Sequence, residues 1–327
     1  YEISACLVGS EMCIRDRSAL LMCFVPASFE ILGLMILAPI FLHLDLLNAA
    51  ILGTVLAAVS PAVVVPLMLK LMDEGYGTKE GIPQLIMAGA SMDDVYVIVL
   101  FTSLLTLAKS GEFNALSLLR IPTSILFGIV SGIVLGYVLC KLYRLLKLST
   151  EIELACMFAV GMALITIERM MTGAVGFSGL LAIMALTATI RHIKPEMADK
   201  YSAVLAKLWQ PAEIFLFALV GASVRIDYAL SFGPVVLIVI ILALLFRMLG
   251  VYLSVMKTKF NMKEKIFTMI AYIPKATVQA AIGGLALEAG LASGELILTA
   301  AVTAILFTAP LGAIFISFTY RNFLQKA

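Results

Sequence analysis

The chain has 327 residues, of which 62% are hydrophobic and 13% charged, and its mean hydropathy of +1.08 is far above that of soluble domains. This composition predicts an all-α polytopic membrane protein. A formal net charge of +2, without basic patches interleaved with aromatic residues, excludes a nucleic-acid partner. The five cysteines have neither CxxC spacing nor histidine companions, so we expect no metal cluster, no disulfide framework and no cofactor.

Residues 1–17 differ from the rest, because the run ACLVGSEMCIRDR resembles translated sequencing-adapter sequence. We expect a non-native leader there, with further native helices upstream. After it, apolar runs of membrane-spanning length predict ten helices. These lie at about 18–43, 44–70, 82–109, 116–140, 152–168, 177–191, 209–224, 230–256, 264–288 and 295–320. Segment 197–208 predicts an amphipathic helix on the cytoplasmic surface or, as an alternative, an ordinary connector.

Lysine and arginine are distributed unevenly between the two sides of the predicted helices. Fifteen follow the even-numbered helices and four follow the odd-numbered ones. Cytoplasmic loops collect positive charge, so we expect the even-side loops and the tail 321–327 to be cytoplasmic. Arg247 and Lys275 belong to no loop and lie inside predicted helices.

Five ionisable residues lie within these helices, namely Glu30, Asp93, Asp94, Arg247 and Lys275. A charged side chain at the centre of a membrane helix costs about 2.5–3.5 kcal/mol on insertion scales, so each is a functional candidate. With a helical rise of about 1.5 Å per residue, all five lie at a similar depth near the middle of the membrane. They therefore predict a single charged layer.

The charges in this layer do not balance, since three carboxylates face two cations. Neighbouring carboxylates in a medium of low dielectric constant cannot all stay ionised, so a proton and a monovalent cation would compete for the surplus charge. We therefore predict that Asp93 and Asp94 bind the metal ion and the proton. The alternative is that all five residues form structural salt bridges, and we favour that interpretation for Arg247 with Glu30, because arginine keeps its proton.

Prolines interrupt two predicted helices near mid-membrane. The residues concerned are Ser60, Pro61 and Pro66 in helix 44–70, and Pro274, Lys275, Thr277 and Gln279 in helix 264–288. Proline removes a backbone donor and frees carbonyls that can coordinate a cation. Predicted helices one to three and eight to ten run in opposite directions, which predicts an inverted repeat whose broken helices cross beside the aspartates. Lys275 would then be a built-in cation that a carboxylate holds when no metal ion is bound.

The sequence resembles the sodium/hydrogen antiporter (NHA) subfamily of the cation/proton antiporter superfamily in VSPAVVVPLMLKLMDEGYGTKEGIPQLIMAGASMDD, FRMLGVYL and KEKIFTMIAYIPKATVQAAIGGLALE, and in overall pattern over 18–320. The resemblance implies a homodimer whose six-helix core moves against a dimerisation domain and exchanges Na+ or Li+ for H+. It implies core helices in 18–109 and 230–320, with linker and dimerisation-side helices in 110–229. It also implies a multi-pass protein of the cell membrane, which we expect to be a bacterial inner membrane, with a role in pH homeostasis.

Position by position, the resemblance implies that Asp93 and Asp94 are the family's paired aspartates, with Asp94 as the direct ion ligand. Ser60–Pro61 matches the first crossing helix and Lys275 the second. Arg247 stands where electrogenic bacterial relatives carry lysine, so transport of a second proton is not implied.

Three other classes of protein are alternatives to this interpretation. A sodium-coupled organic anion symporter shares the architecture but has no aspartate pair facing a lysine. An intramembrane aspartyl protease needs its aspartates on facing helices, whereas Asp93 and Asp94 point about 100° apart on one helix. We therefore predict that the protein is not an enzyme. A proton-conducting redox subunit would carry chains of lysine and histidine across the bilayer.

Overall fold

The computed structural model describes residues 13–110, 120–146, 148–171, 176–222 and 226–326, and every regular element in these ranges is a helix. The chain forms two compact units. Among the described residues, the continuous unit comprises those from 110 to 215, and the split unit comprises those from 13 to 109 and from 216 to 326. Within the described ranges, seven helical segments are long and apolar enough to cross a membrane, and Leu181–Ile193 is a shorter apolar helix. The total of ten helices therefore remains a prediction.

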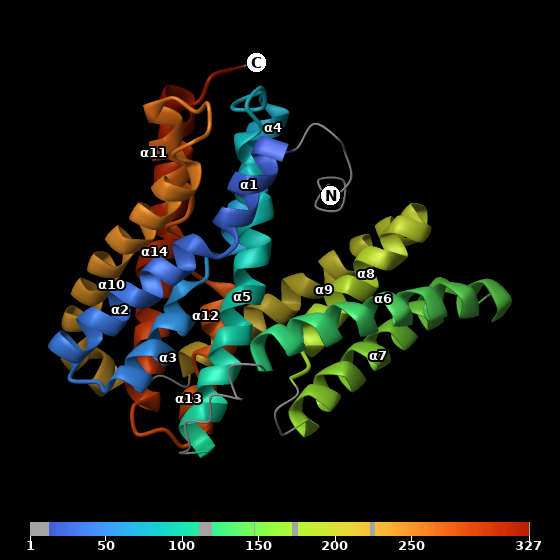
Figure 1. Ribbon diagram of the computed structural model, residues 1–327, viewed down its shortest axis with the longest axis horizontal. Coiled ribbons are helices and arrows are strands. Elements are labelled where there is room, and N and C mark those ends of the chain that lie inside the picture. Colours follow the sequence, from blue (N-terminus) through green and yellow to red (C-terminus); the bar gives the residue numbers. More distant parts are fainter. Residues whose placement is uncertain (1–12, 111–119, 147, 172–175, 223–225, 327) are drawn as a thin grey trace. The chain divides into compact units, whose positions relative to one another are not determined.

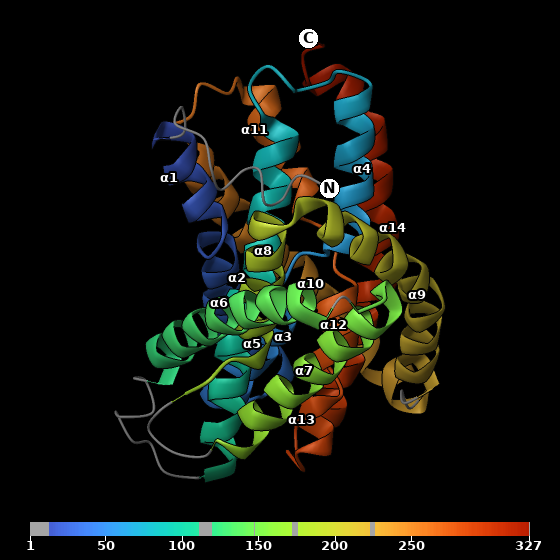
Figure 2. The same cartoon turned by 90° about the vertical axis from the view of Figure 1, so that its right-hand side faces the viewer.

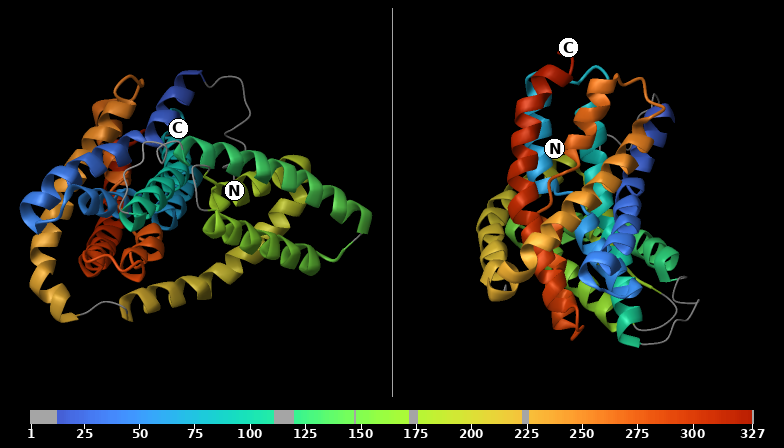
Figure 3. Two further views of the ribbon diagram at one scale, coloured as in Figure 1. Left: turned by 60° about the horizontal axis from the view of Figure 1, so that its bottom comes forward. Right: turned by 90° about the vertical axis from the view of Figure 1, so that its left-hand side faces the viewer.

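The split unit brings together helices from both ends of the chain (Figure 1). Its helices are α1 (Cys13–Met22), α2 (Val25–Leu42), α3 (Leu46–Ala57), α4 (Pro61–Asp73), α5 (Ile82–Ser110), α10 (Ile226–Val255), α11 (Met262–Ala271), α12 (Thr277–Ile282), α13 (Leu285–Glu288) and α14 (Gly294–Phe323). Figure 3 shows α2 beside α10, and Figure 2 shows α14 beside α4. Each of these pairs joins an early segment to a late one.

Both proline-containing segments are interrupted helices. α3 ends at Ala57 and α4 begins at Pro61. Proline is well suited to the first position of a helix, because a backbone N–H there would have no acceptor within the helix. α11 starts at a capping box formed by Asn261 and Glu264 and ends before an extended stretch that contains Pro274. α14 passes so close to this stretch that a Cβ atom on Gly312 would overlap the Pro274 ring.

The structure corrects several predicted elements. Pro66 lies inside α4, and only the three residues before Pro61 are unwound, so Pro66 does not break the helix. The predicted helix 18–43 is divided at Cys23–Phe24 into α1 and α2, where Pro26 occupies the first turn of α2. The predicted helix 264–288 has a second interruption at Gly283–Gly284. Glycine lowers helix propensity at that point, because its backbone loses the most entropy on folding.

The predicted cytoplasmic tail is tied to the turn between α4 and α5. The Gly77 N–H donates to the Gln325 carbonyl at 2.8 Å, and the Tyr320 hydroxyl donates to Glu74 Oε2 at 2.8 Å. Gly77 has φ +67°, a left-handed conformation that glycine adopts without a steric penalty. The C-terminal end of α14 therefore holds the segment that leads into α5.

The continuous unit contains α6 (Arg120–Leu146), α7 (Thr150–Met170), α8 (Gly179–Ile193) and most of α9 (Pro195–Ala222). α9 joins the predicted surface helix 197–208 and the predicted helix 209–224 into one helix that continues through Pro211. α6 packs along α8, and three glycines of α6 face it, Gly128, Gly132 and Gly136. This spacing of small residues lets two helix backbones approach closely.

We expect Gly132→Ala to lower the stability of the protein by about 1–3 kcal/mol, the usual cost of overpacking. The added Cβ would overlap the Ala182 carbonyl oxygen of α8, which is backbone and cannot rotate away. Gly233→Ala on α10 is the matched control, because a Cβ there meets nothing within 4 Å. Thermal melting in detergent should therefore fall for the first variant and stay level or rise for the second. Equal melting temperatures for the two variants would contradict the α6–α8 contact.

Candidate ion site

All five ionisable residues of the predicted layer belong to the split unit. Glu30 lies on α2, Asp93 and Asp94 on α5, Arg247 on α10, and Lys275 in the extended stretch between α11 and α12. Four of them are at most 1% exposed, and Asp94 is partly buried. Four separate segments therefore deliver charge to one buried region.

Arg247 holds two carboxylates at once. Its NH1 group donates to Glu30 Oε2 at 2.9 Å, and its NH2 group donates to Asp93 Oδ2 at 2.6 Å. Its Nε–H donates to the Tyr272 carbonyl at 2.9 Å. The planar guanidinium presents its donors in a fixed fork, which suits contact with several acceptors at once. Arg247 thus joins α2, α5 and the end of α11.

Lys275 is paired with Glu30 rather than with an aspartate. Its Nζ lies 2.7 Å from Glu30 Oε1 and 2.9 Å from Glu30 Oε2, and its backbone N–H donates to Thr308 Oγ1 at 3.0 Å. Glu30 therefore contacts both cations of the layer.

The carbonyls freed at the end of α3 are occupied by protein groups. Lys275 donates to Leu56 O, Arg247 donates to Ala57 O, and the Gln279 amide donates to Ala58 O at 2.9 Å. The C-terminal end of a helix carries partial negative charge, which attracts cations. The proline pattern predicted freed carbonyls that can coordinate a cation, and here the carbonyls at the end of α3 accept hydrogen bonds from two side-chain cations and an amide.

The two interruptions are joined through their backbones. The Ser60 N–H donates to the Pro274 carbonyl at 2.8 Å, and the Val59 N–H donates to Asp93 Oδ2 at 3.2 Å. Ser60 is the residue directly before α4, and Thr277 is the first residue of α12. The first interruption contacts Asp93 through Val59, and the second follows Tyr272, whose carbonyl accepts from Arg247. α5 is thereby connected to both interrupted helices.

Asp94 is the carboxylate that this network leaves over. It forms no salt bridge within the described residues, and its Oδ1 is buried without a hydrogen-bond partner there. Arg247 and Lys275 pair with Glu30 and Asp93, so Asp94 is the one acid of the layer that has no counter-ion within the described residues. The hydropathy pattern and the count of three acids and two bases did not reveal which of the acids has no counter-ion.

Two apolar clusters enclose the charged layer. On α5, Leu85 and Ile86 belong to one cluster, and Val97 and Phe101 to the other, with both aspartates between them. The break between α11 and α12 separates Tyr272 in the first cluster from the second cluster's residues on α12. The ionisable groups therefore lie between two apolar clusters, whose low polarity strengthens the electrostatic interactions among these groups.

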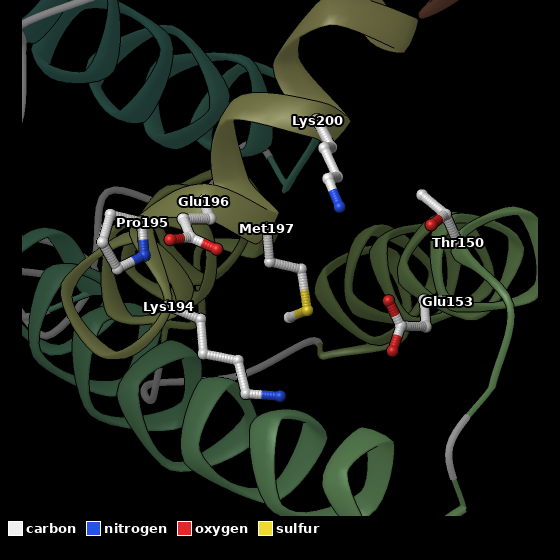
Figure 4. Close-up of a pocket in the computed structure, with 7 residues that line it drawn as sticks. All are labelled: Thr150, Glu153, Lys194, Pro195, Glu196, Met197 and Lys200. Atoms are coloured by element: carbon white, nitrogen blue, oxygen red, sulfur yellow. The ribbon is translucent and has the colours of Figure 1, made fainter.

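A separate pocket of about 340 Å³ lies in the continuous unit (Figure 4). Glu153 of α7 points toward it, and the Tyr201 hydroxyl donates to Glu153 Oε2 at 2.6 Å. Burial, and then this hydrogen bond, raises the pKa of Tyr201, so its hydroxyl stays protonated and donates. The full lining is Thr150, Glu153, Lys194, Pro195, Glu196, Met197 and Lys200. It shares no residue with the charged layer.

Comparison with known proteins places this arrangement in a family. The model of the sodium/hydrogen exchanger transmembrane family matches residues 10–321. Sodium/hydrogen exchanger 9B2 of Homo sapiens is 35% identical over 292 residues, which cover 84% of this chain and 53% of that protein. This chain belongs to the sodium/hydrogen exchanger family. The predicted resemblance to sodium/proton exchangers of the cation/proton antiporter superfamily is thereby confirmed.

Other comparisons agree with that family assignment. Sodium/hydrogen exchanger 9B1 of Homo sapiens is 37% identical over 279 residues, covering 81% of this chain and 53% of that protein. The chain thus spans about half the length of the curated relatives it matches. The solved structure of the sodium proton antiporter MjNhaP1 from Methanocaldococcus jannaschii has a TM-score of 0.83 at 18% identity, covering 98% of this chain and 82% of that one. This likeness shows the antiporter fold.

The family and the apolar helices together identify a multi-pass membrane protein. The curated relatives named here are human proteins, so they lend no support to the expected bacterial inner membrane. Both are named sodium/hydrogen exchangers, which does not support the alternative of an organic anion symporter.

Proposed function

We propose that this chain exchanges Na+ or Li+ for H+ by alternating access, with the cation and the proton competing for Asp94 and its neighbour Asp93. The observation that carries the proposal is the surplus carboxylate, because Arg247 and Lys275 already neutralise the other two acids of the layer. A buried, unbalanced carboxylate is stabilised by either a proton or a metal ion. Binding of one therefore opposes binding of the other, which is the coupling that exchange needs.

Unpaired oxygen atoms support a cation site beside Asp94. Buried oxygens without hydrogen-bond partners within the described residues include Asp93 Oδ1, Asp94 Oδ1, Ser60 Oγ and Gln279 Oε1. Hard cations take oxygen ligands. No group of three or more His, Cys, Asp or Glu side chains in the described residues could hold a metal ion. Hydroxyl and amide oxygens would therefore complete the ligand set around the transported ion.

The stoichiometry follows from which cation of the layer can lose a proton. Arginine stays protonated, so Arg247 cannot supply a second proton, whereas a lysine can. We propose that Asp94 carries the exchanged proton and that Arg247 and Glu30 form a structural ion pair. If Lys275 also titrates during the cycle, exchange becomes electrogenic.

The finer organisation is part of the same proposal. The helices of the split unit would form the ion-translocating core, including an inverted repeat, and those of the continuous unit would face a partner in a homodimer. The excess of lysine and arginine supports cytoplasmic positions for the α4–α5 turn and the C-terminal tail. The partners implied are Na+ or Li+, H+ and the lipid bilayer, with a role in pH homeostasis.

The proposal is tested by flux in proteoliposomes that hold a pH gradient and a pH-sensitive dye. Addition of Na+ or Li+ should dissipate the gradient, and K+ serves as the comparison that defines selectivity. Repeating the assay at different imposed membrane potentials determines whether net charge moves. A gradient that persists at every cation concentration and pH, in folded protein, would contradict the proposed exchange.

A further inference from the structure

Tyr272 is a buried residue at the end of α11, directly before the extended stretch that carries Lys275. Its side chain is 1% exposed and belongs to the apolar cluster that includes Leu85 and Ile86 of α5. Sequence reasoning did not single it out, although it directly precedes the run Ile273-Pro274-Lys275. Its position places an aromatic ring where the apolar cluster meets the charged layer.

The Tyr272 hydroxyl presses against α5 one helical turn before Asp93. A Cβ atom on Gly89 would overlap this hydroxyl and would lie 2.9 Å from Met22 Cβ. Residues four apart on a helix share a face, so Gly89 and Asp93 lie on the same side of α5. Tyr272 and Met22 thus both lie against Gly89, one turn before Asp93 on α5, and we call this contact the Tyr272 seal.

Arg247 holds the seal and the ion site together. Its Nε–H donates to the Tyr272 carbonyl at 2.9 Å, and its guanidinium carbon lies 5.4 Å from the centre of the Tyr272 ring. The same guanidinium binds Asp93 and Glu30. Movement of Arg247 relative to Asp93 would therefore displace the ring as well.

The hydroxyl contacts Gly89 in the closed seal but is buried and forms no hydrogen bond within the described residues. Buried tyrosine hydroxyls usually find a partner, because leaving one unpaired costs about 1–3 kcal/mol. A phenylalanine ring would fill the same space without that cost. The hydroxyl is therefore explained by a state of the site in which it has something to bind.

We propose that Tyr272 is a positioning residue of exchange: its ring, held by Arg247, closes the approach to Asp93, and its hydroxyl hydrogen-bonds the hydrated cation that enters when the ring leaves Gly89. This inference rests on the proposed Na+/H+ exchange. The ligand that Tyr272 would bind is a hydrated monovalent cation. From there the cation would pass to Asp93 Oδ1 and Asp94 Oδ1, which have no hydrogen-bond partner within the described residues.

Tyr272→Phe separates this role from a packing role, because stability and transport should change in opposite directions. Removing an unpaired buried hydroxyl should raise the melting temperature in detergent. Loss of a hydrogen bond to an ionic ligand should raise the apparent KM for Na+ about tenfold in the proteoliposome assay. A variant with unchanged KM, in a preparation where the parent exchanges Na+, would overturn the inference and leave the proposed function standing.

A second pair of variants tests the geometry of the seal without relying on transport. Gly89→Ala should lower the melting temperature, and adding Tyr272→Phe should restore part of the loss, because the atom that the added Cβ overlaps most is the hydroxyl oxygen, whereas the close contact with Met22 Cβ remains. Gly284→Ala is the control, since a Cβ there meets nothing within 4 Å and its effect should simply add to that of Tyr272→Phe. Absence of any rescue of Gly89→Ala would overturn the seal. If the parent itself showed no Na+-dependent flux, the proposed function would fall, and the rescue experiment would still decide the contact.

Discussion

Asp94→Asn is expected to abolish Na+-dependent proton flux while leaving the protein at least as thermally stable as the parent. The variant keeps the shape of the side chain but removes the charge that the layer does not neutralise, since Asp94 forms no salt bridge within the described residues. Loss of one ionic ligand corresponds to about 1.5–3 kcal/mol, or a roughly 10- to 100-fold loss of cation affinity, before the missing proton site is considered. Asparagine binds no exchangeable proton at this position, so coupled flux should fall to background.

Asp93→Asn is the matched variant on the neighbouring residue. Asp93 accepts from Arg247 at 2.6 Å and from the Val59 N–H at 3.2 Å, so removal of its charge should lower the melting temperature as well as the flux. If Asp94→Asn is stable but inactive and Asp93→Asn is destabilised, the carboxylate without a counter-ion is Asp94. Wild-type flux from Asp94→Asn would refute this assignment.

Arg247→Met is expected to destabilise the protein by about 3–5 kcal/mol, because it leaves buried carboxylates without a counter-ion. Glu30 and Asp93 are both fully buried, and after the substitution only Lys275 remains to neutralise them. Adding Asp93→Asn should recover part of the loss, because the Glu30–Lys275 pair is then balanced. This non-additivity is the signature of a shared network and is measurable by thermal melting in detergent.

Arg191→Met provides the control for loss of an ion pair as such. Arg191 pairs with Asp199 at 2.9 Å, but their side chains are 30% and 47% exposed, so the pair should contribute no more than about 1 kcal/mol. A melting temperature for Arg247→Met equal to that of Arg191→Met would show that the buried network is not a stabilising unit. Identical losses for Arg247→Met with and without Asp93→Asn would show that the two residues are not coupled.

Local properties of the sequence were sufficient to find the charged layer. Hydropathy marks the membrane-spanning runs, and the helical rise then places the five ionisable residues at one depth. The interruptions at Ser60–Pro61 and Pro274 also follow from local chemistry, because proline cannot donate a backbone hydrogen bond. Pro66 shows the limit of this reasoning, since the same residue type continues inside α4 without breaking it.

The pairing of charges depended on contacts between distant segments. Glu30 lies 217 residues from Arg247 and 245 from Lys275, and the rotation of each helix determines which of them it meets. The carbonyls at the C-terminal end of α3 accept hydrogen bonds from Lys275, Arg247 and Gln279, which lie between 190 and 221 residues away in the chain. No pattern within α3 carries that information.

The sequence by itself therefore determined that the protein is a helical membrane protein of the sodium/hydrogen exchanger family with three acids and two bases inside its apolar helices, because hydropathy, proline positions and family motifs are properties of short segments. Only the tertiary structure decided that Asp94 is the unneutralised acid and that Tyr272 lies against Gly89. The physical reason is that both facts depend on contacts that α5 makes with Arg247 of α10 and with Tyr272 at the end of α11, where side-chain volume and charge from remote parts of the chain meet.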